Sequence, residues 1–119
     1  MEQKMNRTEF FEEWADALES GEFQQGGGQL NYQDKYFCCL GVACELLHRK
    51  GLIERYTKES GCVGYGKEKE FYLLPSKVHE MFDLNLSPRK INGFALSAMN
   101  DNGISFAEIA KIVRSGDIQ

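Results

Sequence analysis

Apolar and polar positions alternate with a helical period near the start of the chain. Between Phe10 and Leu18 the apolar side chains recur every three to four residues, and acidic side chains fill the positions between them. Asn6 and Glu9 have the spacing of a capping box, and Gly21 suits the left-handed residue that follows a helix. The pattern predicts a helix from about residue 6 to residue 20.

A second apolar segment predicts the central helix of the fold. The stretch KYFCCLGVACEL begins with strand-like alternation, and residues 28–38 predict a hairpin that turns at Gln33-Asp34. From Cys39 to Lys50 the apolar residues then cover an arc of about 200° on a helical projection, and Gly51 ends the pattern. The other side of this helix carries Gly41, Glu45, His48 and Arg49.

Shorter patterns fill the second half of the chain. The residues 62–65 and 71–74 read as two strands of a second hairpin, with the charged segment KEKE at its tip. The further elements expected are a short helix from Pro75-Ser76, a loop over 85–93, a helix over about 94–99 and a helix over 106–113 that begins at a capping box of Ser105 and Glu108. The fold class is therefore α+β, with about five helices around a small antiparallel sheet of two hairpins, in a single domain over residues 1–119.

Composition narrows the class of protein. The 119 residues are 42% apolar and 27% charged, which is ordinary for a globular domain. The net charge of −4 argues against a nucleic-acid partner, because such proteins normally carry a basic surface. No apolar stretch is long enough to span a membrane, and the N-terminus lacks the apolar run of a signal peptide, so we expect a cytoplasmic protein without a membrane partner.

Four cysteines raise the question of chemistry. Cys38, Cys39, Cys44 and Cys62 would remain reduced in a cytoplasm, which argues against disulfides. Cys39 and Cys44 diverge on a helix, and no second ligand pair completes a set with His48, so we predict neither a metal site nor a cofactor.

A cysteine nucleophile is the alternative that would make the protein an enzyme. Cys39, with Cys38 just before it, lies in the first turn of the central helix, where the helix dipole favours a thiolate. His79 is the base that this hypothesis would require. Buried cysteines chosen for their size are the simpler interpretation, since free cysteine is among the most buried residue types.

Polar and glycine-rich positions suggest a ligand site instead. Gly41 lets a ligand or another backbone approach the first helical turn beside Cys39 and Glu45, and packing of the preceding hairpin would explain it equally well. The triple glycine after Gln25 predicts a mobile loop that closes over a ligand. The ligand-binding set expected from the sequence is Gln25, Gln29, Cys39, Gly41, Glu45, Asn100 and Asp101.

Four segments taken in order resemble a functionally uncharacterised family of small phage and bacterial proteins. They are WADALESGEFQQGGGQL, CCLGVACELL, the LP-x2-V of residues 74–78, and a closing ND-x-G-x-SF-x-EIA over residues 100–110. The resemblance implies a phage or prophage accessory protein in the cytoplasm of a host bacterium. It implies no mechanism, because the activity of the group is not established.

The sequence thus favours non-catalytic binding. The protein would sequester a nucleotide-derived signal of host defence or block a host protein, and such binders often form pockets between subunits, so we expect a homo-oligomer. Tyr65 and Tyr72 are the aromatic rings expected to stack on a base. A cysteine-dependent hydrolase or transferase is the alternative. DNA binding through Lys111 and Arg114 is the weakest hypothesis, because those two cations are few.

Overall fold

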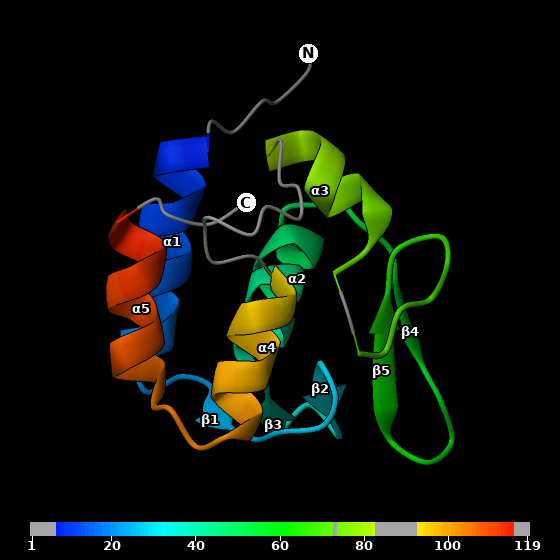
Figure 1. Cartoon of the computed structure of the whole chain (residues 1–119). Helices are drawn as coiled ribbons and strands as arrows, with labels where there is room; N and C mark the ends of the chain where they lie inside the picture. The colour runs from blue at the N-terminus through cyan, green and yellow to red at the C-terminus, as the bar shows by residue number, and fades with distance from the viewer. Residues whose placement is uncertain (1–6, 73, 83–92, 116–119) are drawn as a thin grey trace.

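A computed structural model describes residues 7–72, 74–82 and 93–115 (Figure 1). The helices are Arg7–Glu19 (α1), Cys39–Arg49 (α2), Ser76–Phe82 (α3), Gly93–Asp101 (α4) and Phe106–Ser115 (α5). The strands are Gln24–Gln25 (β1), Asn31–Tyr32 (β2), Tyr36–Phe37 (β3), Arg55–Thr57 (β4) and Cys62–Tyr65 (β5). The α+β class and the helices expected from the sequence are confirmed.

The helix ends follow the signals in the sequence. Gly21 and Gly51 have φ angles of 83° and 75°, which only glycine adopts at little cost after a helix. The Ser105 hydroxyl accepts a hydrogen bond from the Glu108 amide at 3.2 Å and so caps α5. The expected cap Asn6 and the expected loop, apart from its last residue, lie outside the described residues.

The sheet is mixed, with strand order β1-β3-β2-β5-β4. The first expected hairpin is confirmed, because β2 and β3 pair antiparallel. Gln33 and Asp34 have φ angles of 59° and 57° and form a tight turn that the Lys35 amide closes on the Tyr32 carbonyl at 3.1 Å. Because Tyr32 pairs with Tyr36, three residues connect the two strands. The sequence did not predict β1, which pairs parallel with β3 at the edge of the sheet.

The second expected hairpin was wrong in one strand. β5 pairs antiparallel with β4, whereas we had expected residues 71–74 as its partner. After β5 the chain makes a tight turn, in which a single bridge joins Tyr65 to Glu70. Beyond that turn the Phe71 carbonyl accepts a hydrogen bond from Leu30, and the Phe71 ring lies where a side chain on Gly64 would lie. Phe71 thus packs on the sheet instead of extending it.

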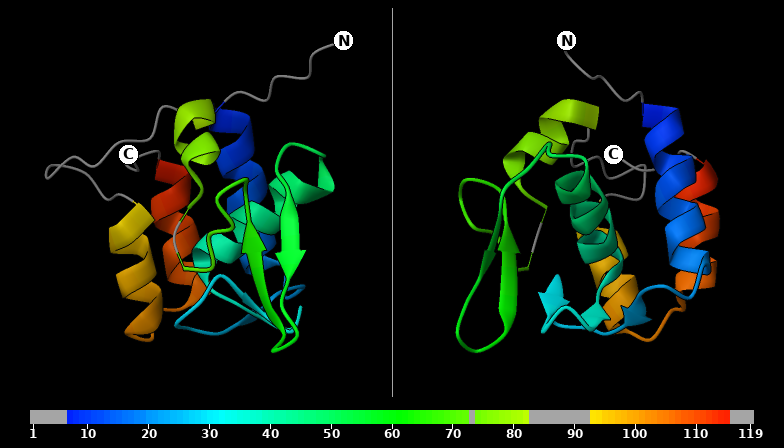
Figure 2. Two further views of the ribbon diagram at one scale, coloured as in Figure 1. Left: turned by 90° about the vertical axis from the view of Figure 1, so that its right-hand side faces the viewer. Right: turned by 180° about the vertical axis from the view of Figure 1, so that it is seen from behind.

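α2 occupies the middle of the molecule. Figure 2 shows it between a helical layer, with α1 and α5 side by side, and the β4–β5 hairpin on the opposite side. The largest fully buried side chains come from both sides of α2, among them Trp14, Leu40, Tyr65, Leu96 and Ile109. In the described part of the chain no helix is both long and apolar enough to cross a bilayer.

Candidate functional site

The thiols of α2 lie in the core. Cys38, Cys39 and Cys44 are all at most 2% exposed, and Cys62 is partly exposed. The Cys39 thiol donates to the Leu96 carbonyl at 3.5 Å, and the Cys39 carbonyl accepts from the indole of Trp14 at 2.9 Å. Both polar ends of Cys39 are therefore used by neighbouring helices.

Burial keeps these thiols protonated. It raises the pKa of Cys38 to about 11, and it raises the pKa of Cys39 and of Cys44 well above the ordinary value. A protonated thiol is a poor nucleophile, so the environment does not favour the hydrolase hypothesis. His79, its required base, lies in α3, but its side chain falls outside the described residues.

Gly41 is buried beneath the first hairpin. A Cβ atom on Gly41 would lie 1.7 Å from the Leu30 carbonyl oxygen, so the backbone before β2 makes the close approach that the glycine permits. The first-turn amides are also occupied, since Gly41 donates to the Cys38 sulfur and Cys39 donates to Asn100. The expectation that this turn is open to a ligand is corrected: the chain itself covers it.

Two amide side chains form a second polar cluster, which we term the amide junction (Gln25 and Asn100). The Asn100 carbonyl oxygen accepts from the Gln25 amide at 3.0 Å and from the Cys39 backbone at 3.2 Å. The Gln25 carbonyl oxygen accepts from the Phe106 amide at 3.1 Å, at the start of α5. The amide junction therefore ties β1, α2, α4 and α5 together.

The glycine loop is held against α4. Asn100 donates to the Gly26 carbonyl at 2.6 Å, and Asp101 accepts from the Gly28 amide at 2.9 Å. A Cβ on Gly26 would lie 2.7 Å from the Tyr36 side chain. These contacts correct the expectation of a mobile loop. Gln29 is partly exposed, and whether any of these residues binds a ligand stays a prediction.

A buried ionic cluster lies on the other side of α2, and we term it the ionic network (Glu45, Arg55, Tyr65, Asn31 and Asp34). The Glu45 carboxylate accepts from the Tyr65 hydroxyl at 2.8 Å and from Arg55 at 2.9 Å, with only 8% of its side chain exposed. Asn31 donates to Tyr65 and to Asp34, and Arg55 also pairs with Asp34. Every polar end therefore has a partner.

The network shifts the pKa of its members in consistent directions. Burial raises the pKa of Tyr65, and the charge of Glu45 raises it further. Burial acts to lower the pKa of Arg55, but Asp34 and Glu45 outweigh it and raise the pKa. Burial likewise acts to raise the pKa of Asp34, and hydrogen bonds from Asn31 and Arg55 outweigh it and lower the pKa. The cluster thus favours the charged forms of Arg55 and Asp34 and the neutral form of the Tyr65 phenol.

Of this network, sequence reasoning placed Glu45 in the ligand-binding set and Tyr65 as a ring stacking on a base, and it did not connect the two. Asn31, Asp34, Arg55 and Tyr65 were missed as its partners, because they come from three strands and a turn that are separate from α2 in the sequence. Glu45 could have indicated the network, because it lies on a helix that the apolar pattern places in the centre of the fold. A carboxylate buried there requires a cation as its partner.

A cavity of about 430 Å³ opens where the turn after β5 meets α3. Its lining alternates in charge and comprises Glu54, Lys67, Glu68, Ser76, Lys77 and Glu80. Glu68 accepts a hydrogen bond from the Ser76 amide at 3.0 Å, so this carboxylate is committed to the start of α3. None of these residues was expected at a site.

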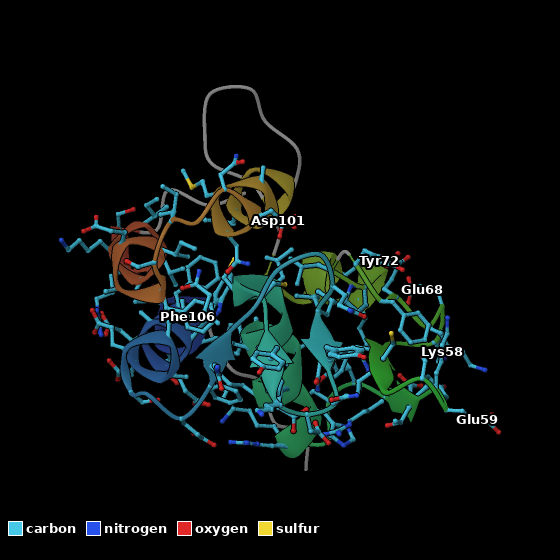
Figure 3. The ribbon with its side chains drawn as sticks, turned by 90° about the horizontal axis from the view of Figure 1, so that it is seen from below. Lys58, Glu59, Glu68, Tyr72, Asp101 and Phe106 are labelled. Atoms are coloured by element: carbon cyan, nitrogen blue, oxygen red, sulfur yellow. The ribbon has the colours of Figure 1, made fainter. Side chains whose placement is uncertain are left out.

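The aromatic rings expected to stack on a base differ in exposure. Tyr65 is fully buried, which corrects that expectation, whereas Tyr72 is 62% exposed. Figure 3 shows Tyr72 and Glu68 on the side of the molecule that carries α3, away from Asp101 and Phe106. Tyr72 is thus exposed, although it is not among the residues that line the cavity.

Two further expectations concern cations. Arg114 pairs with Glu12, Asp16 and Glu19 of α1, and Lys111 pairs with Glu108, so both helical cations are already matched with carboxylates. Among the described residues, no three His, Cys, Asp or Glu side chains gather closely enough to hold a metal ion.

Comparison with known proteins gives a family and no relative of known activity. A family model described as a domain of unknown function, DUF8296, matches residues 5–116. A search of curated proteins and a search of solved structures each found no match.

Proposed function

The chain belongs to the DUF8296 family, and we propose that it acts by binding a small molecule rather than by catalysis. In the form favoured by the sequence, it is an accessory protein of phage or prophage type that sequesters a nucleotide-derived signal of host defence. A second version of the proposal is that the protein binds and blocks a host protein instead of a small molecule.

The cavity beside α3 carries this proposal. Its volume of about 430 Å³ falls within the range of small-molecule sites. The ammonium groups of Lys67 and Lys77 supply point charges of the kind that bind phosphate. Glu54 and Glu80 supply acceptors for the hydroxyl groups of a ribose, and the exposed ring of Tyr72 is a stacking surface for a base.

The polar clusters elsewhere support binding over catalysis. The three core thiols are held protonated by burial, and the ionic network uses its carboxylates and guanidinium on one another. Catalysis by any of these groups would first require breaking buried hydrogen bonds. The cavity lining includes two lysines that make no ion pair within the described chain, so they meet a ligand without that cost.

Isothermal titration calorimetry with a panel of mononucleotides, cyclic nucleotides and dinucleotides tests the proposal. We expect at least one phosphorylated nucleoside to bind, and the variant Lys67→Gln/Lys77→Gln to weaken it at least tenfold. Lys111→Gln on α5 is the control for a lysine lost outside the cavity lining, and each single variant, Lys67→Gln and Lys77→Gln, is compared with it because each removes one positive charge. Lys111→Gln should bind normally. Flat traces for the whole panel would contradict sequestration and leave the blocking of a host protein.

A further inference from the structure

The outer edge of the sheet has a form that fits a second copy of the chain. β4 is the last strand in the order β1-β3-β2-β5-β4, and no described strand pairs with its outer side. Figure 2 shows the β4–β5 hairpin at the margin of the molecule, beyond α2. An unpaired edge is a template for pairing with another strand.

The hydrogen bonds between β4 and β5 show which backbone groups remain. Lys58 donates to the Cys62 carbonyl, and Gly66 donates to the Glu54 carbonyl, both at 2.9 Å. In an antiparallel ladder the bonded residues alternate, so positions 54, 56 and 58 face β5. The N–H and C=O groups of Arg55 and Thr57 therefore point away from the sheet.

We propose that two copies of the chain pair through this edge about a twofold axis at Tyr56. The ladder then joins Arg55 to Thr57 of the partner subunit, and Thr57 to Arg55 of the partner subunit. Each pair exchanges two backbone hydrogen bonds, so all four outward groups of each β4 find a partner. The two five-stranded sheets become one continuous sheet of ten strands.

Charge complementarity favours this register. With Tyr56 on the axis, Glu54 lies directly opposite Lys58 of the partner subunit, and the same pair recurs across the axis. These side chains share a face with Tyr56, because alternate residues of a strand point the same way. Opposite charges facing one another stabilise a strand pair, and a shift of two residues in either direction breaks both pairs.

The groups that would pair are free to do so in the single chain. Within the described residues, neither Glu54 nor Lys58 makes an ion pair. The Lys58 ammonium lies 4.1 Å from the centre of the Phe71 ring, a contact that an exposed side chain gives up readily.

The dimer would also add a residue to the rim of the cavity, although the dimer does not depend on the proposed function. Glu54 belongs to the cavity lining, so Lys58 of the partner subunit would lie at its rim and add a third cation. The two proposals fail separately: a dimer that binds no nucleotide refutes only the ligand, and a monomer that binds one refutes only the interface.

Sedimentation equilibrium over a wide range of protein concentration tests the interface. We expect a monomer–dimer equilibrium that Thr57→Pro abolishes, because the ring removes an outward N–H and occupies the place of the partner. Proline is tolerated on an edge strand when its nitrogen faces outward, so circular dichroism and thermal stability should stay near those of the wild type. A dimer that persists in Thr57→Pro would overturn the proposal, as would a monomer at every concentration of the wild type.

A charge-reversal set tests the register and does not depend on the proline variant. Glu54→Lys or Lys58→Glu alone places like charges across the axis and should weaken dimerisation about tenfold or more. The double variant Glu54→Lys/Lys58→Glu restores opposite charges and should recover the affinity of the wild type. A double variant as weak as the single variants would refute this register.

Discussion

The two sides of α2 are both buried, and they are buried by different means. One side packs on helices, where Cys39 contacts Trp14 and Leu96 through single hydrogen bonds among apolar side chains. The other side packs under the sheet, where Gly41 meets a backbone carbonyl and Glu45 meets an arginine and a tyrosine.

The difference teaches which substitutions each side tolerates. Apolar packing among helices adjusts to small changes in volume at moderate cost. On the sheet side, position 41 has no room for a side chain, and the buried charge of Glu45 requires its hydrogen-bond partners. A substitution at either position therefore cannot be absorbed by a small adjustment in packing. We therefore expect the sheet side of α2 to be the more sensitive side.

Gly41→Ala should give the largest effect. The new Cβ would lie 1.7 Å from the Leu30 carbonyl oxygen, so the hairpin must move away from α2. We expect a loss of more than about 3 kcal/mol in the free energy of unfolding, measured by urea denaturation. The sign of the change in the free energy of unfolding decides the question. If the space beside Gly41 were open, alanine would stabilise the helix by up to about 1 kcal/mol.

Glu45→Ala should follow closely. It removes the acceptor of the Tyr65 hydroxyl and one of the two carboxylates that pair with Arg55. Removal of one partner of a buried ion pair costs about 3 kcal/mol. Glu22→Ala is the control on the same side of the molecule, because it breaks the exposed pair with Arg49 and should cost less than about 1 kcal/mol. Equal losses in the two variants would show that the ionic network adds nothing.

Acid should destabilise the sheet side selectively. The fold lowers the pKa of Asp34 from its ordinary value of 3.8, so its contribution is present above that pH. That contribution is lost as the pH falls through the lower value of the folded state. Asp34→Asn should reduce the loss of stability between pH 5 and pH 2 in urea titrations. Parallel curves for the two proteins would contradict this role of Asp34.

The smallest effect concerns the helical side. In the native protein we expect iodoacetamide to modify Cys62 alone, because the other three thiols are buried and protonated. Mass spectrometry of Cys62→Ser should then show no modification until urea is added. Rapid native alkylation of Cys39 would revive the nucleophile hypothesis and contradict the buried thiol.

Local signals in the sequence predicted the helices well. The ends of α1, α2 and α5 rest on glycines and on a serine cap that act within a few residues, so their meaning does not depend on distant contacts. The first hairpin was predicted for the same reason, because its turn at Gln33-Asp34 is a local feature.

Partners that lie far apart in the sequence could not be predicted in this way. β4 and residues 71–74 compete for the same edge of β5, and the choice depends on Phe71 packing over Gly64, a contact that no local pattern reveals. The polar side of α2 looked exposed because Glu45 and Gly41 are not apolar. Its burial depends on Arg55 and Tyr65, which the helical projection does not include.

The pairing of α1 with α5 has a consequence for synthesis on the ribosome. Asp16 bonds to Arg114 across 98 positions of the sequence. At about 5–20 residues per second, α1 waits roughly 5–20 s before α5 is made. The part of its surface that packs on α5 has no partner during that time. The carboxylates of Glu12, Asp16 and Glu19 then help to keep the nascent helix from aggregating, before they bind Arg114 of α5.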